Sequence, residues 1–328
     1  MNFIRVLAGA VVIVGAASAC SRAASSADDH TAHMSAADAA VPAAGTGNSQ
    51  GNAGLPASNN NAAARVKDSP RHAEWVKVAW EPGSSDSLMA WIVYPSTSRA
   101  KSPVVVVVHE IFGLSTWVRG VADQVAAEGF IAIAPDLVSR VRGGPSTEEL
   151  SGDSARKIIQ GVNSTERNKG IAAVARYAMS QPSAAQKYGV IGYCWGGQTV
   201  FQHAVNGGVP GYSGGVAFYG LPYMTGGGQG GPPAAPNADS LAKIKTPVML
   251  LNGSKDARIA SAMPALDSVM KALGKKYSAQ NYDGAVHGFL RAQDDPKAQR
   301  DPAEEAANLA ATKDGWPRTV AFLKANLK

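Results

Sequence analysis

The chain has 328 residues, of which 45% are hydrophobic and 17% charged, and its formal net charge is +6. This composition excludes a disordered or fibrous protein, and the length suits one large domain or two of ordinary size. The basic residues form no dense runs, so we expect no nucleic-acid partner, whereas the positive charge favours an anionic small molecule as substrate.

The first 19 residues have the pattern of a bacterial export signal. Arg5 precedes an apolar run over residues 6–17 that is too short to span a bilayer. Small residues then precede Cys20, as in the lipobox of bacterial lipoproteins, although Ala17 stands where leucine is commoner. Two routes remain open: lipidation of Cys20, which would tether the protein to a membrane, or ordinary cleavage before Cys20. Both predict a periplasmic or outer-membrane-tethered protein.

Residues 20–64 are rich in Ala, Ser, Gly and Asn and contain few large apolar side chains. Such a segment buries too little surface to offset the entropy of ordering, so the composition predicts a disordered tether. His30 and His33 lie in it beside two aspartates. A solvated tether explains these histidines better than a metal site does, and we expect neither a metal nor a cofactor.

From residue 65 to residue 328, strand-like and helix-like segments alternate. The alternation predicts a single α/β domain in which a mostly parallel central sheet carries helices on both faces. A Gly-, Pro- and Ala-rich stretch over residues 223–240 predicts an inserted surface loop. The expected strands are 74–80, 88–94, 104–108, 130–135, 188–192, 216–219, 248–251 and 276–282, and the expected helices are 118–128, 171–179, 198–205, 261–273 and 316–327.

The most informative motif is Gly-Tyr-Cys-Trp-Gly over residues 192–196. It is a thiol version of the G-x-S-x-G turn, which joins a strand to a helix and exposes its central nucleophile. A strand-like run precedes the motif and a helix-like run follows it, which places Cys194 at a helix N-terminus, where thiolate is favoured. The alternative is a buried structural cysteine in a Gly-rich turn. If Cys20 is lipidated or removed, Cys194 lacks an intramolecular disulfide partner.

A thiol nucleophile needs a base, and the base needs an orienting acid. In hydrolases with this turn the three residues follow in the order nucleophile, acid, base. His287 lies late in the chain in a loop flanked by glycines, and Asp256 comes shortly after a predicted strand. Asp283 is a weaker competitor, and Asp239 lies in the inserted loop. The order therefore predicts Cys194 as nucleophile, Asp256 as acid and His287 as base.

The oxyanion hole of such a site uses two backbone N–H groups. One belongs to the residue after the nucleophile, here Trp195, and the other to the loop after an early buried strand. That loop begins at His109, and Ile111 is the expected donor. Glu110 is unusual there, because an acid beside an oxyanion hole opposes negative charge. The alternative for Glu110 is an exposed loop acid.

Together these motifs resemble the dienelactone hydrolase family. The resemblance spans about residues 70–328, and a glutamate beside the oxyanion strand combined with a cysteine nucleophile is its specific element. It implies the α/β-hydrolase fold and a hydrolase of carboxylic esters or lactones. In that reaction Cys194 attacks the acyl carbon, His287 transfers the proton and Asp256 orients His287. It also implies that Glu110 holds the thiol neutral and turned away until substrate displaces the carboxylate. The motifs that carry the resemblance are residues 109–113, 192–197, 253–256 and 287–289.

The resemblance further implies two arginines that bind a substrate carboxylate. Arg291, four residues after His287, falls where one is expected, although a solvated arginine is the alternative. Arg156 lies in the general region of the second. The insertion at 223–240 and the export signal depart from the cytoplasmic members of the family, which leaves the dienelactone substrate open. Two other functions also stay open: a non-catalytic, surface-tethered binding protein on a hydrolase scaffold, and a thioesterase or peptidase with the same triad.

Overall fold

The computed structural model describes residues 51–96, 101–146, 152–226, 234–294 and 301–328. The predicted export signal, Cys20 and the tether as far as residue 50 lie outside the described residues, as does part of the inserted loop, residues 227–233. Within the described ranges, no helix combines the length and the apolar character that crossing a membrane requires.

A central sheet organises the described part of the chain, and eight strands form it there. Its strands are β1 (Ala73–Ala79), β2 (Ser87–Val93), β3 (Ser102–Val108), β4 (Ile131–Asp136), β5 (Ala184–Tyr193), β6 (Tyr212–Phe218), β9 (Val248–Gly253) and β10 (Tyr277–Tyr282). They lie in the order β1-β2-β4-β3-β5-β6-β9-β10. The β1–β2 and β2–β4 pairs are antiparallel and the other neighbours are parallel. The prediction of a mostly parallel sheet is confirmed.

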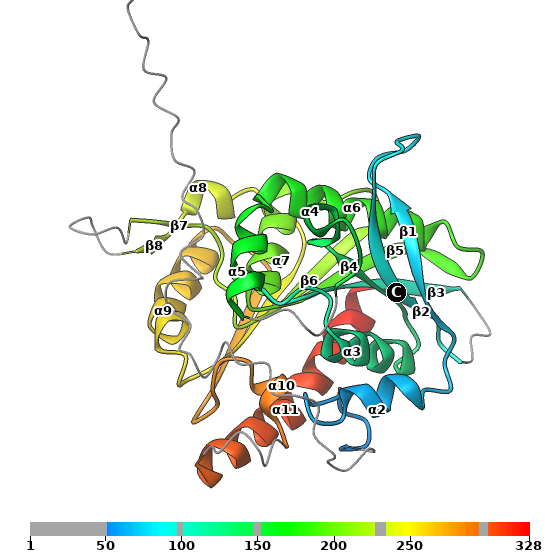
Figure 1. Ribbon diagram of the computed structural model, residues 1–328. Coiled ribbons are helices and arrows are strands. Elements are labelled where there is room, and N and C mark those ends of the chain that lie inside the picture. Colours follow the sequence, from blue (N-terminus) through cyan, green and yellow to red (C-terminus); the bar gives the residue numbers. More distant parts are fainter. Residues whose placement is uncertain (1–50, 97–100, 147–151, 227–233, 295–300) are drawn as a thin grey trace, which may run out of the picture.

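Helices cover both faces of the sheet (Figure 1). Helices α3 (Thr116–Ala127) and α11 (Pro302–Asn326) lie on one face, and α6 (Ser164–Met179), α7 (Trp195–Asn206) and α9 (Ala257–Ala272) lie on the other. This layering is that of the predicted α/β-hydrolase fold. The shorter helices are α2 (Ala62–Lys67), α4 (Ser139–Arg142), α5 (Gly152–Gln160), α8 (Ala238–Leu241) and α10 (Phe289–Ala292).

The parallel strands align so that their carboxyl ends meet at one edge of the sheet. Val108 of β3 pairs with Gly192 of β5, and the next residue of β5, Tyr193, pairs with Phe218 of β6. Phe218 in turn pairs with Leu251 of β9. The loops after these strands therefore emerge side by side, which is where open α/β sheets bind their ligands.

The described part of the 223–240 stretch lies outside the central sheet. Strands β7 (Met224–Thr225) and β8 (Ala235–Pro236) pair antiparallel in a small sheet of their own, and α8 follows. Thr225 and Ala235 are exposed. The described residues agree with an inserted surface element.

The prediction that the disordered tether reaches residue 64 is wrong for its last part. Leu55 is 7% exposed and Ala57 is fully buried, and α2 begins at Ala62. The indole Nε1–H of Trp117 on α3 donates to the carbonyl of Ala57 over 2.9 Å. Residues 51–61, here named the N-terminal strap, are therefore part of the domain.

Small residues let the N-terminal strap pack without large apolar side chains. A Cβ added to Gly120 of α3 would lie 3.0 Å from the Cβ of Ala57, so the strap runs close to the helix. The strap also hydrogen bonds to the region of α10. The N–H of Asn59 donates to the carbonyl of Arg291 over 3.0 Å, and the amide of Gln293 donates to the carbonyl of Pro56 over 3.1 Å. Composition alone does not reveal such backbone contacts.

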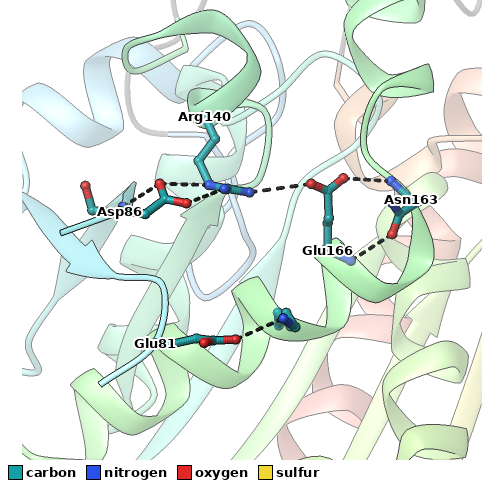
Figure 2. Close-up of polar contacts among 7 residues, drawn as sticks. Glu81, Asp86, Arg140, Asn163 and Glu166 are labelled. Atoms are coloured by element: carbon teal, nitrogen blue, oxygen red, sulfur yellow. Dashed lines mark hydrogen bonds and ion pairs between the residues drawn. The ribbon is translucent and has the colours of Figure 1, made fainter. Parts of the chain in front are cut away.

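Helix α6 begins seven residues earlier than predicted, because a capping box starts it. The Asn163 side chain accepts from the N–H of Glu166 over 3.0 Å, and the Glu166 side chain accepts from the N–H of Asn163 over 3.3 Å. Figure 2 shows Arg140 of α4 between Asp86 and Glu166, so α4 and the turn before β2 are tied to the start of α6.

Candidate active site

The sharp turn between β5 and α7 holds Cys194. This residue has φ 55° and ψ −115°, a backbone conformation that residues other than glycine rarely adopt, and it serves as the N-cap of α7. A Cβ at Gly192 would lie 2.1 Å from the carbonyl oxygen of Gly196, so the turn tolerates no side chain there. The structure thus places Cys194 on the strand-to-helix turn that its motif predicts. The expected exposure of the nucleophile is not found, because Cys194 is buried with 3% of its surface exposed.

Close backbone contacts fix this turn against two neighbouring strands. A Cβ at Gly196 would lie 2.5 Å from the carbonyl oxygen of Val108, at the end of β3. A Cβ at Gly197 would lie 2.5 Å from the carbonyl oxygen of Phe218, at the end of β6. The nucleophile turn therefore packs closely against the carboxyl ends of β3 and β6, which limits how far Cys194 can move.

The candidate base and acid form a hydrogen-bonded pair. Nδ1 of His287 lies 2.6 Å from Oδ2 of Asp256, and both side chains are nearly buried. The other carboxylate oxygen of Asp256 accepts from the N–H of Ile259 as the N-cap of α9. Burial raises the pKa of Asp256, but the hydrogen bond and charge of His287 outweigh it and lower this pKa below its ordinary value. Asp256 is therefore ionised and orients the imidazole.

Backbone contacts bring the loops of the acid and the base together. A Cβ at Gly253 would lie 2.4 Å from the carbonyl oxygen of Ala285, which accepts from the N–H of Lys255 over 3.0 Å. From α11, the buried Asn308 accepts the N–H of Val286 over 3.0 Å. The position of His287 is thus set by contacts on both sides of its loop.

The two competing acids lie elsewhere. Asp283 accepts from the Ser254 hydroxyl over 3.3 Å at an exposed position, and Asp239 lies in the first turn of α8. Neither carboxylate contacts His287, whose Nδ1 faces Asp256. The structure pairs the base with the acid that the chain order favours.

Electrostatics couple His287 to the nucleophile. Burial lowers the pKa of His287, but the negative charge of Cys194 and hydrogen bonding to Asp256 and Cys194 raise it to about 10. Nε2 of His287 is buried and makes no hydrogen bond of standard geometry, although the side chain of Cys194 is close enough to shift the pKa of His287. The base and the nucleophile are therefore electrostatically coupled.

The expected oxyanion donors belong to the start of α7 and to the loop after β3. Trp195 is the first residue of α7, and an N–H at this position has no partner within its helix. Ile111 lies in the loop after β3, and both side chains are buried. Two backbone N–H groups, one of them at a helix N-terminus, can stabilise a negative oxygen.

Glu110 is buried rather than an exposed loop acid. Its Oε2 lies 3.7 Å from Nη1 of Arg291, and both side chains are nearly inaccessible to solvent. The guanidinium of Arg291 also lies over the ring of Phe112, 5.3 Å from its centroid. Arg291 is therefore not a solvated surface residue, and the structure brings it to Glu110. Arg156 pairs instead with Asp153 of its own helix, α5.

A family model described as "Dienelactone hydrolase family" matches residues 88–327. The chain belongs to the dienelactone hydrolase family. It is accordingly a hydrolase. A relative from Escherichia coli K12, provisionally named a carboxymethylenebutenolidase, is 27% identical over 244 residues, 74% of this chain and 84% of the relative. The carboxymethylenebutenolidase of Pseudomonas putida is 32% identical over 115 residues, 34% of this chain and 49% of that protein.

Solved structures share the fold of this dienelactone hydrolase family member. A provisionally described dienelactone hydrolase from Klebsiella pneumoniae has a TM-score of 0.59 at 24% identity, covering 77% of this chain and 99% of the other. A dienelactone hydrolase-like promiscuous phosphotriesterase from metagenomic libraries has a TM-score of 0.56 at 22% identity, with coverages of 75% and 98%. The N-terminal strap precedes the residues that the family model matches.

Two residues near the site were missed at the level of sequence. Tyr219 follows β6 with φ 40°, and its ring centroid lies 4.8 Å from that of His287. Burial, followed by the charge of Glu110, holds the pKa of its hydroxyl well above the ordinary value. Its place at the carboxyl end of a predicted strand was the available signal. Arg167 of α6 is the second, since its guanidinium lies 4.8 Å from the ring centroid of Trp195.

Proposed function

We propose that the chain hydrolyses carboxylic esters or lactones through a Cys194–His287–Asp256 triad and an acyl-enzyme thioester. The observation that carries the proposal is the 2.6 Å pair of His287 and Asp256, coupled electrostatically to a cysteine on a strained strand-to-helix turn. Nucleophile, base and orienting acid are the three parts that nucleophilic acyl transfer requires.

The first half-reaction forms the thioester. Sγ of Cys194 bonds to the acyl carbon as its proton passes to Nε2 of His287. The carbonyl oxygen becomes an oxyanion that the N–H groups of Ile111 and Trp195 stabilise. When the oxyanion collapses, the C–O bond to the leaving group breaks. Nε2 of His287 gives its proton to the departing alkoxide, and Asp256 stabilises the imidazolium until then.

The second half-reaction releases the acid. Water attacks the thioester carbon while Nε2 of His287 takes one of its protons. The same two N–H groups hold the second oxyanion, and its collapse breaks the C–S bond. Protonation of Sγ by His287 returns Cys194 to its starting state, so the net reaction consumes one ester and one water.

Substrate charge enters through the Glu110–Arg291 ion pair. A substrate carboxylate that binds Arg291 competes with Glu110 for the guanidinium, which lies 3.7 Å from Glu110 at rest. Displacing Glu110 lets the thiol proton of Cys194 pass to Nε2 of His287, which later delivers it to the leaving group. This exchange provides a physical basis for a preference for anionic esters or lactones.

The decisive experiment replaces Cys194 with Ala and measures hydrolysis of a p-nitrophenyl ester. Turnover should disappear, and mass spectrometry of the wild type during turnover should show a covalent acyl adduct on the peptide containing Cys194. Cys20→Ser is the matched control, because it removes the other cysteine, which belongs to none of the catalytic motifs. Unchanged turnover in Cys194→Ala contradicts the triad. Saturable binding of ligands without turnover by the wild type would support a binding protein instead.

A second experiment tests the substrate charge. Arg291→Ala should raise KM for an anionic lactone by roughly 10- to 150-fold, the value of one charged hydrogen bond of about 1.5–3 kcal/mol. KM for a neutral short-chain ester should change much less. Arg318→Ala removes an exposed arginine that pairs with Asp314 and serves as the control. Equal effects on both substrates would contradict a carboxylate-binding role for Arg291.

The N-terminal sequence supports export, and we propose that Cys20 carries the lipid. Arg5, the apolar run at 6–17 and the small residues before Cys20 are the basis. Full-length protein expressed in a bacterium should partition into detergent with membrane lipoproteins, and Cys20→Ser should move it to the soluble periplasmic fraction. Soluble wild-type protein whose N-terminus has lost residues 1–19 would contradict lipidation and support ordinary cleavage.

A further inference from the structure

Three side chains form a buried stack beside the nucleophile turn. The rings of His109 and Trp195 are nearly parallel, with an interplanar angle of 14° and centroids 5.5 Å apart. The guanidinium carbon of Arg167 lies 4.8 Å from the Trp195 ring centroid. His109 is fully buried, and Trp195 and Arg167 are 2% and 1% exposed. The stack joins the loop after β3, the start of α7 and the start of α6.

Arg167 also holds the first turn of α7 through hydrogen bonds. Its Nη1 donates to Oε1 of Gln198 over 3.1 Å and to Oγ1 of Thr199 over 3.4 Å. The Thr199 hydroxyl in turn donates to the carbonyl of Trp195 over 2.8 Å. The guanidinium therefore contacts both the indole of Trp195 and side chains of the turn that begins with its N–H.

His109 fixes the direction of the other oxyanion donor. The N–H of Leu137 donates to Nε2 over 3.1 Å, so Nε2 carries the lone pair and the proton sits on Nδ1. Nδ1 lies 2.5 Å from the carbonyl oxygen of Glu110 and donates to it. In a trans peptide the C=O and the following N–H point in opposite directions. Holding the Glu110 carbonyl toward His109 therefore turns the N–H of Ile111 away from His109.

Burial also keeps His109 in the form that this arrangement needs. Desolvation lowers the pKa of His109, outweighing the charge of Asp136 and the hydrogen bond to Glu110. A neutral imidazole has one N–H and one acceptor nitrogen, which matches the two hydrogen bonds observed.

We propose that His109 and Arg167 are positioning residues that both pack against the indole of Trp195 and set the directions of the two oxyanion N–H donors. The proposal rests on the hydrolase function proposed above, because it assigns no chemistry to His109 or Arg167 themselves. It names two side chains, His109 in the loop of Ile111 and Arg167 bonded to the first turn of α7, that hold these two backbone donors in place. Small displacements of such donors are costly to catalysis.

Core packing alone does not require these side chains. An apolar chain of similar length at position 167 would fill the same volume without the desolvation cost of a buried guanidinium. A leucine at position 109 would likewise fill much of the imidazole volume. Such replacements would preserve the fold and lose the hydrogen bonds that orient the two loops, so activity and stability respond differently.

The test compares transition-state stabilisation with folding in the full chain. Arg167→Met and His109→Leu should each lower kcat for p-nitrophenyl butyrate by about 10- to 100-fold, less than the complete loss of a donor costs, with KM changed little. Butanal adds to the Cys194 thiol to give a hemithioacetal, whose former carbonyl oxygen occupies the oxyanion hole. Its inhibition constant should rise by a factor similar to the fall in kcat.

Conservative variants and a control separate positioning from structure. His109→Asn keeps a donor near the place of Nδ1 and should recover part of the kcat lost in His109→Leu. Should Arg167→Met fail to fold, Arg167→Lys keeps charge and length but loses the planar stack, and should show the same paired losses. The control is Asn168→Ala, next to Arg167 on α6, which removes the hydrogen-bond partner of Nδ1 of His203 on α7. This variant should lower the melting temperature without changing kcat.

Two results would overturn the proposal. One is a folded Arg167 or His109 variant that keeps kcat within about twofold of the wild type, since about 10-fold is the smallest expected loss. The other is a loss of kcat with unchanged inhibition by butanal. Failure of the hydrolase function itself looks different, because then the wild type does not turn over the ester or Cys194→Ala turns it over equally well.

Discussion

At the scale of single residues, Asp256 carries two separable tasks. One carboxylate oxygen caps α9 and the other faces Nδ1 of His287. Asn at position 256 keeps an oxygen for the cap, but its amide group favours the wrong tautomer of the imidazole. We therefore expect Asp256→Asn to lower kcat by about 10²- to 10⁴-fold while the unfolding free energy changes little, as measured by steady-state kinetics and urea denaturation.

Asp283→Asn is the control for this prediction, because Asp283 was the competing acid in the sequence. It lies at an exposed position against Ser254, so its loss should leave kcat within about twofold, as for other surface substitutions. A larger loss of kcat in Asp283→Asn than in Asp256→Asn would show that the acid has been assigned wrongly.

Gly196 is the second residue whose role is decided by backbone geometry. A Cβ there would lie 2.5 Å from the carbonyl oxygen of Val108 and 2.6 Å from that of His109, and neither backbone atom can rotate away. Gly196→Ala should push the oxyanion loop from the nucleophile turn, lowering kcat at least about 100-fold and destabilising the fold by about 1–3 kcal/mol. Gly144→Ala, where no atom lies within 4 Å, should change neither quantity.

The sequence predicted Cys194, Asp256 and His287 because each follows a strand in the order that the strand-to-helix turn requires. It did not reveal Arg167, although a signal existed. Asn163 and Glu166 have the spacing of a capping box, which would have started α6 before Arg167 and placed that arginine in helical register with Ile171. An arginine on the apolar face of a predicted helix would then have indicated a buried charge and a candidate residue of the site.

At the scale of secondary-structure elements, the N-terminal strap depends on one buried hydrogen bond to α3. Trp117→Phe keeps an aromatic ring but leaves the carbonyl of Ala57 without its donor. An unsatisfied buried carbonyl costs about 1–3 kcal/mol, so the unfolding free energy should fall by that amount. Trp75→Phe, at a half-buried position on β1, is the control and should cost less. Equal losses in urea denaturation would contradict a specific role for the strap contact.

Element boundaries were predicted poorly where polar caps or prolines decide them. Helix α11 begins at Pro302, in the first turn, where proline is tolerated, rather than at the predicted residue 316. Pro317 lies inside this helix, although a proline at an interior position removes a hydrogen bond and ordinarily ends or kinks a helix. Hydrophobic periodicity identifies the strands reliably, because β3 is almost entirely buried and apolar, but it says little about polar helix ends.

At the scale of the whole molecule, the fold class followed from alternation alone, whereas the extent of the domain did not. The strap is ordered by contacts with α3 and α10, which are distant from it in the chain. Local composition contains no record of such partners, so a polar, small-residue segment is assigned to disorder when its neighbours are unknown. Global stability is likewise decided by burial, which a sequence window does not show.

Acid sensitivity of the whole molecule is the last consequence of burial. His203 is fully buried on α7; its Nδ1 lies 2.5 Å from Oδ1 of Asn168, and its Nε2 lies 2.9 Å from the hydroxyl of Tyr188. Burial lowers the pKa of His203 from 6.5 to about 3. The unfolded chain therefore binds a proton that the folded chain does not, so stability is full above about pH 6.5 and falls as the pH drops toward 3.

His203→Gln removes this titration at the cost of the two hydrogen bonds. The variant should have a lower unfolding free energy than the wild type at pH 8. The difference in unfolding free energy between the two proteins, here named the gap, should narrow by about 1.4 kcal/mol per pH unit between pH 6 and pH 4. His72→Gln, at an exposed position, is the matched control. Unfolding free energies from urea denaturation at several pH values measure the gap, and a gap that stays constant would mean that His203 does not govern the acid limb. Because His203 lies one helix turn beyond Thr199, such unfolding would also release the start of α7 and the oxyanion hole with it.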